Sequence, residues 1–331
     1  MQPARGPARW AAVFFFLVLL AGAGCGHLLK IADADRPALF VTPPADQPAA
    51  ARLAPAILAH NPHQTHNLVG RVTASRDEQG AEVIRVDPAH PAIYYGTFPF
   101  TTAKGAYRNL VYRVHFPGTP ASLAPFLLGW GDNLGLLIIL TLDQTGHPVL
   151  VTTLGTCGCY VSLTATDYLP PESLPAGWTG RPGEIYGETL PARLAFRGLD
   201  RPRLVVEVRP GEHRVMGLLV VEDAAARRPG YWAPRPTELL PLEALERLPL
   251  PDGHTVSMFH EDGALAGHVK GAWKPWETLL MWPFSLDLAV GWDKAYGDPR
   301  NPFYTSLQPW YRHASDLNDF PRFLKFWGWR L

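Results

Sequence analysis

Two cysteines separated by a single glycine are the strongest chemical signal in this sequence. Cys157 and Cys159 flank Gly158 and follow an apolar run. Alternate side chains of a strand share a face, so both sulfurs are expected on one side. In a flat strand their Cα atoms would lie roughly 6.5–7 Å apart, at the limit for a relaxed disulfide, and Gly158 can bend the backbone to close that gap. The pair predicts a two-sulfur chelate, a strained and reducible disulfide, or two inert thiols.

Two thiolates one residue apart suit a soft metal such as Cu(I), or Zn(II). A complete metal site needs one or two further ligands. His115 is the first choice, because its strand is expected beside the cysteine strand in one sheet. The weaker choices are His147, His213 and the tract His60, His63 and His66. The favoured hypothesis is a soft-metal or thiol-redox binding or accessory role through Cys157, Cys159 and His115, with Cu or Zn as the candidate cofactor. The structural alternative is a plain disulfide or a buried thiol pair.

The same segment also allows a cysteine nucleophile. Thr156–Tyr160, TCGCY, is similar to the Ser-His-Gly-Cys segment of cell-wall L,D-transpeptidases. The resemblance covers five residues and implies Cys159 as the thiolate, with His147 as the upstream histidine. Cys157 stands where that segment has histidine, and no arginine follows Cys159 closely. An acyl-transfer enzyme is therefore the alternative to a non-enzymatic protein.

A predicted β-hairpin positions the cysteines. Leu136–Leu142 is apolar or β-branched throughout, which favours a strand buried on both faces. Asp143–Gly146 supplies the turn, and Pro148–Thr153 continues with residues that favour strands. Earlier in the chain, Leu110–Phe116 has the alternation of a strand. Leu110, Tyr112, Val114 and Phe116 share one face, while His115 lies on the other.

These patterns predict an α+β protein with a mostly antiparallel sheet or sandwich core. We expect a signal segment over residues 1–25, a tether and short helix over 26–65, a β-rich core over 66–260, and an aromatic-rich, mainly helical segment over 261–331 that packs on the core. Helices are expected at 49–59, 239–248, 278–292 and 317–327, and a short one within 119–128.

The first 25 residues resemble a bacterial lipoprotein signal. Arg5 and Arg9 precede the apolar run Trp10–Leu20, and small residues lead to Cys25. The resemblance implies lipidation of Cys25; ordinary cleavage after Ala23 and an uncleaved anchor are the alternatives. All three predict a protein outside the cytoplasm, in the cell envelope or periplasm and attached to a membrane through its N-terminal region. An oxidising compartment leaves Cys157 and Cys159 to each other.

Composition narrows the choice of partners. Lys plus Arg and Asp plus Glu both total 30 in the 331 residues, which gives no reason to expect nucleic acid. Tryptophan and other aromatic residues gather after Trp273. Such density is typical of a packed subdomain, of sugar-stacking platforms or of a membrane-interface belt. Packing is favoured, and a glycan-binding module using Trp282 and Trp292 is a further alternative. A cell-envelope protein or glycan is the expected partner.

Overall fold

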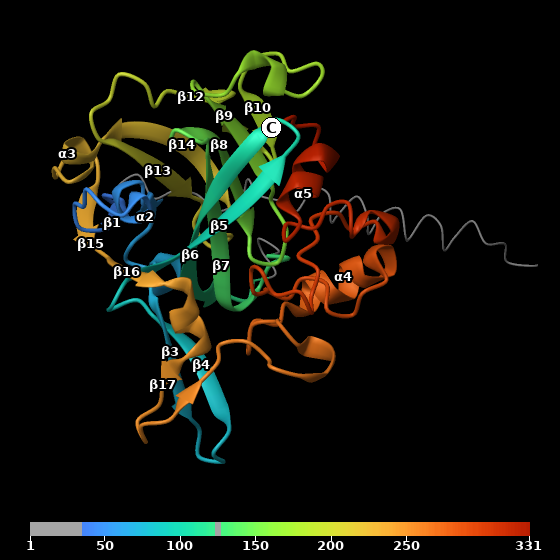
Figure 1. Cartoon of the computed structure of the whole chain (residues 1–331). Helices are drawn as coiled ribbons and strands as arrows, with labels where there is room; N and C mark the ends of the chain where they lie inside the picture. The colour runs from blue at the N-terminus through green and yellow to red at the C-terminus, as the bar shows by residue number, and fades with distance from the viewer. Residues whose placement is uncertain (1–34, 123–126) are drawn as a thin grey trace, which may run out of the picture.

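The computed structural model describes residues 35–122 and 127–331. Strands make up 39% and helices 15% of the described residues, in several sheets, which agrees with the predicted α+β class (Figure 1). The predicted signal segment with Cys25, the first part of the predicted tether and the middle of the predicted 119–128 helix lie outside the described residues.

The largest sheet has seven strands and contains the predicted hairpin. In spatial order its strands are β12 (Arg193–Leu194), β9 (Ser162–Thr166), β8 (Pro148–Gly155), β7 (Gly131–Leu142), β6 (Gly105–Thr119), β5 (Ala92–Thr102) and β16 (Glu238–Pro241). The five strands from β5 to β9 are antiparallel neighbours, and the two edge strands pair in parallel. The register sets His115 opposite Gly135, and Leu136 opposite Gly155.

A second sheet has five strands. Its order is β14 (Val215–Glu222), β13 (Pro202–Val208), β2 (Ala56–Ala59), β1 (Ala38–Val41) and β15 (Ala233–Pro236). The predicted tether over 26–65 is wrong for residues 38–59, because β1 and β2 are fully buried strands inside this sheet. The expected helix over 49–59 is likewise reduced to α2 (Ala49–Arg52), since Pro55 ends it and the apolar run AILA joins the sheet.

The remaining elements are short. Two-stranded pairs are formed by β3 (Arg71–Arg76) with β4 (Glu82–Asp87), β10 (Gly183–Ile185) with β11 (Glu188–Leu190), and β17 (Leu248–Pro249) with β18 (Thr255–Val256). The other α-helices are α3 (Asp223–Ala226), α4 (Pro275–Ser285) and α5 (Phe320–Phe326). Single 3-10 turns are η1 (Thr65–Asn67), η2 (Pro171–Ser173), η3 (Leu242–Glu246), η4 (Gly263–Leu265) and η5 (Pro309–Tyr311). The helix expected at 239–248 is instead β16 followed by η3, because Leu239 and Leu240 extend the edge of the seven-stranded sheet.

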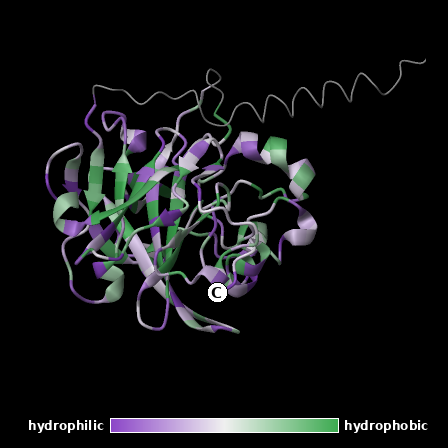
Figure 2. Cartoon of the chain, turned by 90° about the horizontal axis from the view of Figure 1, so that it is seen from above, coloured by the Kyte–Doolittle hydropathy of each residue, from purple (hydrophilic) through white to green (hydrophobic). Residues whose placement is uncertain are grey.

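The core lies on both faces of the seven-stranded sheet. Leu110, Tyr112, Val114 and Phe116 share one hydrophobic cluster with side chains of the five-stranded sheet, which confirms the predicted alternation. Strand β7 is buried on both faces, also as predicted. Hydrophobic colour follows the strands in Figure 2.

The C-terminal segment covers the other face of this sheet. Phe303, Leu317, Phe320, Phe323 and Leu324 join a cluster with Val111, Leu137, Ile139 and Leu150. Between α4 and α5 the backbone consists mostly of turns and extended segments. Packing of aromatic side chains, more than regular helix, therefore joins this segment to the sheet.

Candidate functional site around the Cys157–Cys159 disulfide

The two cysteines form a disulfide immediately after β8. Their Cα atoms are 5.5 Å apart, closer than a flat strand would hold them. The backbone turns back on itself, because Gly158 donates its N–H to the Gly155 carbonyl at 2.9 Å and Gly155 donates to the Cys159 carbonyl at 2.8 Å. Gly158 has a φ of +93°, which is the bend expected from the sequence. Of the three predicted arrangements, the structure contains the disulfide.

Gly158 is also tightly enclosed. A Cβ atom there would lie 2.3 Å from the Tyr304 carbonyl oxygen, whereas a Cβ on Gly146, with a φ of +84°, would have no neighbour within 4 Å. Gly158→Ala is therefore expected to lower the free energy of unfolding by at least about 2 kcal/mol, through both an unfavourable φ and a clash. Gly146→Ala, the matched control, is expected to lose about 1 kcal/mol through φ alone. Urea denaturation of the two variants checks this, and equal losses would contradict it.

A cavity of about 180 Å³ opens beside the disulfide. Cys157 is buried, whereas Cys159 is partly exposed. The cavity is lined mainly by apolar and aromatic side chains, among them Tyr160, Tyr186, Met281, Tyr304 and Leu307, with Glu277 as its acid. A second, smaller cavity is also lined by Cys157, Cys159 and Glu277. The disulfide and this carboxyl group thus share both cavities.

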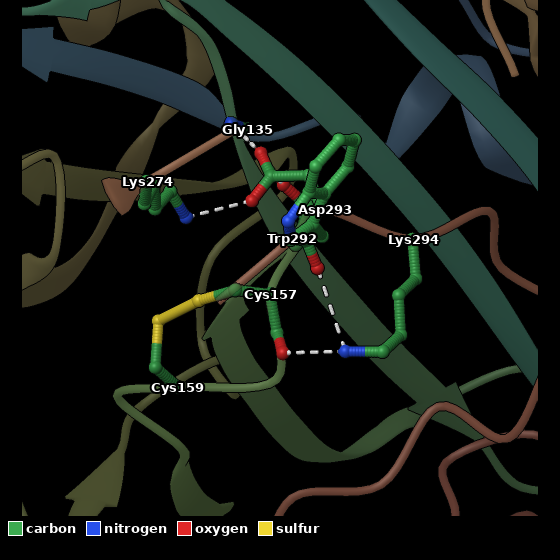
Figure 3. The surroundings of a disulfide bond; sticks show 8 residues. Gly135, Cys157, Cys159, Lys274, Trp292, Asp293 and Lys294 are labelled. Atoms are coloured by element: carbon green, nitrogen blue, oxygen red, sulfur yellow. Dashed lines mark hydrogen bonds and ion pairs between the residues drawn. A yellow bond between two sulfur atoms is a disulfide. The ribbon is translucent and has the colours of Figure 1, made fainter. Parts of the chain in front are cut away.

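Near the disulfide lies a buried carboxylate, Asp293 (Figure 3). It accepts hydrogen bonds from the Gly135 N–H at 3.0 Å and from the Thr156 hydroxyl at 2.6 Å, and it forms an ion pair with Lys274 at 2.7 Å. Gly135 belongs to β7, and Thr156 directly precedes Cys157. Asp293 therefore fastens the start of the cysteine turn to the neighbouring strand.

A second buried lysine contacts the cysteine turn directly. Lys294 Nζ donates to the Cys157 carbonyl at 3.1 Å and to the Trp292 carbonyl at 3.4 Å, and it lies 4.5 Å from the centre of the Tyr304 ring (Figure 3). Burial lowers the pKa of Lys294 to about 8, against the opposing effect of Asp287 and Asp293. At neutral pH this side chain is still mostly a cation next to Cys157.

The pKa values of the neighbouring Glu277 and Lys274 are also shifted. Burial raises the pKa of Glu277 above its usual range, and Lys274 offsets only part of that effect. Burial would lower the pKa of Lys274, but the carboxylates of Asp293 and Glu277 hold it above its ordinary value. The site thus combines a protonatable carboxyl group with two buried ammonium groups.

His115 lies on the same side of the seven-stranded sheet as the cysteine turn, but it does not bind the sulfurs of Cys157 and Cys159. Its Nε2 accepts a hydrogen bond from Arg113 Nε at 2.8 Å, and it stacks edge-on against Tyr94. Burial, followed by the charge of Arg113, holds the pKa of His115 well below its ordinary value. Gly135 and Thr156 lie next to the His115 ring, and Thr156 directly precedes Cys157. Across residues 35–122 and 127–331, no group of three or more His, Cys, Asp or Glu side chains is arranged to hold a metal ion.

The weaker histidine candidates lie elsewhere. His147 precedes β8, at the opposite end of that eight-residue strand from the cysteines, roughly 25 Å away along the strand. His60 bonds Glu207 at 2.6 Å, His63 pairs with Asp35, and His66 offers its carbonyl to His213 at 2.8 Å. The histidine tract is therefore divided among separate partners.

Sequence reasoning missed the four charged residues of the site, Lys274, Glu277, Asp293 and Lys294. Their local signal is weak, since they are few charges within an apolar, aromatic C-terminal segment and form no recognisable motif. Asp293 is fully buried in the ion pair with Lys274. Asp287 accepts a hydrogen bond from Tyr304, and Asp298 pairs with Arg300.

In the described part of the chain no helix combines the length and apolar character needed to cross a bilayer. No protein-family model matches the chain, and neither the curated proteins nor the solved structures contain a match to it.

Proposed function

We propose that this protein is an exported, envelope-associated thiol–disulfide redox protein, attached to a membrane through its first 25 residues. The observation that carries the proposal is a Cys-Gly-Cys disulfide with one partly exposed sulfur facing an aromatic cavity and buried charges behind it. Lipidation at Cys25 is part of the proposal and rests on the signal-like sequence alone. We also propose that the two large sheets constitute a β-sandwich, because one apolar cluster joins them.

The exchange begins at the accessible sulfur. A thiolate of a partner dithiol attacks Cys159 Sγ, the Cys157–Cys159 bond breaks, and the electron pair leaves on Cys157 Sγ. The second thiolate of the partner then attacks the partner's own sulfur in the mixed disulfide and releases Cys159. The partner dithiol becomes a disulfide, and the two cysteines gain two electrons and two protons. The reverse sequence would reduce a partner disulfide.

The buried charges favour this order of events. A nearby cation stabilises a thiolate and lowers its pKa, and Lys294 reaches the backbone of Cys157, the leaving residue. Glu277, whose pKa is raised by burial, is the carboxyl group that lines the same cavities as both cysteines. The aromatic lining around Cys159 suits an apolar side chain next to the partner's cysteine.

The test is the reactivity of the two sulfurs in the folded protein. Dithiothreitol without denaturant is expected to reduce the pair, with both thiols then alkylated as read by mass spectrometry. Cys157→Ser, which leaves the more accessible Cys159, is expected to react with 5,5′-dithiobis(2-nitrobenzoate) at least about tenfold faster than Cys159→Ser, since reaction requires an accessible thiolate. If dithiothreitol reduces the disulfide only after the protein has been unfolded, the disulfide is structural and the proposal is refuted.

The same reduced sample tests the metal alternative. Stoichiometric Zn(II) or Cu(I) retained by the reduced protein, and lost in both Cys157→Ser and Cys159→Ser, would support metal binding instead. Such a site would need a ligand besides the two sulfurs. Retention that also depends on His115 would restore that histidine as the third ligand.

A further inference from the structure

The exposed apolar residues are concentrated in one part of the described chain. Ten of the twelve large hydrophobic side chains that are exposed lie between Trp273 and Trp327, and the other two are Tyr186 and Tyr231. Five of the ten fall within ten residues at the end of α4 and just beyond it. We call these five the apolar tip, which consists of Leu279, Trp282, Phe284, Leu286 and Leu288.

The apolar tip carries no charge of its own. From Thr278 to Leu286 the sequence TLLMWPFSL contains no ionisable side chain. The next residue, Asp287, accepts a hydrogen bond from the Tyr304 hydroxyl at 2.7 Å and lies 3.7 Å from Arg312. The carboxylate is thereby directed toward its own protein, and the surface around it remains leucine and aromatic.

The residue with the most unusual conformation is also part of the tip. Leu286 has a φ of +51° and ends α4 by donating its N–H to the Trp282 carbonyl at 2.7 Å. Glycine or asparagine is the usual residue in this left-handed position, and a leucine there is disfavoured. Its side chain is 69% exposed, and that of Leu288 is 76% exposed, so neither is explained by packing within the fold.

We propose that the apolar tip inserts into the interface of the lipid bilayer to which the N-terminal segment attaches the protein, an inference that rests on the proposed membrane attachment. Exposed tryptophan, phenylalanine and leucine within one short segment are the composition that partitions into a membrane interface. Leucine has no group to hydrogen-bond a sugar, and three of the five residues are leucine, so a glycan is a poorer fit. Trp310 and Tyr311, both exposed, follow in the same segment beside the cationic Arg312.

The chain before the fold can bring the tip to the bilayer. Fourteen residues separate Leu20, the last of the apolar run, from Asp35, where the described structure begins, and they can span at most about 50 Å. A connection of that length keeps the folded part near the membrane without fixing which face turns toward it. The tip supplies the orientation, and it holds the cavity beside Cys159, whose lining includes Met281 of α4, close to the lipid headgroups.

The test uses the full chain, reconstituted in vesicles of phosphatidylcholine and phosphatidylglycerol at a 3:1 ratio. With Cys25 lipidated and therefore without a free thiol, and with the disulfide left oxidised, Leu286→Cys is labelled with the environment-sensitive fluorophore NBD. The emission is expected to shift to the blue and to be lost when phosphatidylcholine carrying a doxyl quencher is included. The matched control is Tyr231→Cys, 68% exposed and close to β15, whose Ala233 pairs with Ala38 near the start of the described chain. If the N-terminal connection alone brought the protein near the bilayer, the NBD emission of this control would shift as much as that of the label on the tip.

The outcomes separate the two proposals. If the chain floats with the vesicles but NBD at position 286 stays unshifted and unquenched, the tip does not dock and the membrane attachment stands. If the chain does not float and the label is unshifted, both proposals fail. A blue shift without quenching that grows with protein concentration would assign the tip to a second copy of the chain. A shift caused by cell-wall glycan fragments without vesicles would assign it to a glycan.

Discussion

Replacing Asp293 with alanine is expected to lower the free energy of unfolding by about 3–5 kcal/mol, because the change leaves a buried ammonium group without its counter-charge. Asp293 is fully buried and receives three donors, from Gly135, Thr156 and Lys274. The loss should also free the cysteine turn, since Thr156 directly precedes Cys157. We therefore expect faster reduction of the disulfide by dithiothreitol in this variant.

Urea denaturation at pH 7 measures the effect. The control is Asp46→Ala, which removes an exposed ion pair with Arg201 and should cost at most about 1 kcal/mol. The double variant Lys274→Met/Asp293→Asn removes both charges, and its loss should be smaller than the sum of the two single losses. Additive losses would show that Lys274 and Asp293 do not act as a pair.

Local pattern was sufficient to predict the part of the fold around the cysteines. The hairpin of β7 and β8 followed from two apolar runs and a polar turn, and the alternation in β6 correctly separated the face that packs on the five-stranded sheet from the face with His115. The bend at Gly158 was also readable, since glycine between two cysteines is free to adopt a positive φ. These features depend on neighbours within a few residues.

The first two strands were missed for a physical reason. The runs ALFV and AILA in β1 and β2 are four residues each, are set among prolines, and contain several alanines, which favour helix. They become strands because they pair with each other and with β13 and β15, far along the chain. The local sequences of β1 and β2 do not indicate which strands they pair with.

The charged residues of the site could not be predicted from the local sequence either. Asp293 meets Thr156 across 137 residues, and Lys294 meets Cys157 across the same separation. His115, chosen because its strand was expected near the cysteine strand, does lie two strands away in the same sheet, but Arg113 occupies its Nε2. Strand order could be anticipated from the sequence, whereas the competition for a single ring nitrogen could not.

Acidification is expected to destabilise the protein strongly, with His213 as a main cause. The ring is buried, its Nε2 donates to the His66 carbonyl at 2.8 Å, and it stacks on Phe116 at 4.3 Å between ring centres. Burial lowers the pKa of His213 from 6.5 to about 3, helped by His66 and Lys274 and opposed by the hydrogen bond to the His66 carbonyl. Between these two values the unfolded chain binds a proton that the folded chain does not, so stability falls as the pH falls. Each pH unit in that window removes about 1.4 kcal/mol, or about 3 kcal/mol between pH 6.5 and pH 4.

The contribution of this one histidine can be isolated by substitution. His213 has a φ of +55°, so asparagine, which tolerates that conformation, is the suitable replacement. His213→Asn will lower stability at pH 7 by removing the stacking, but its further loss from pH 7 to pH 4 should be about 3 kcal/mol smaller than that of the wild type, because there is no proton left to bind at this position. His268, with a pKa lowered by burial to about 4, and His115 will still contribute a loss in the same direction. His90→Asn, which changes an exposed ring, should leave most of the wild-type pH dependence in place. Urea denaturation at several pH values distinguishes these cases, and parallel curves for wild type and His213→Asn would mean that the His213 ring is protonated equally in the folded and unfolded chains.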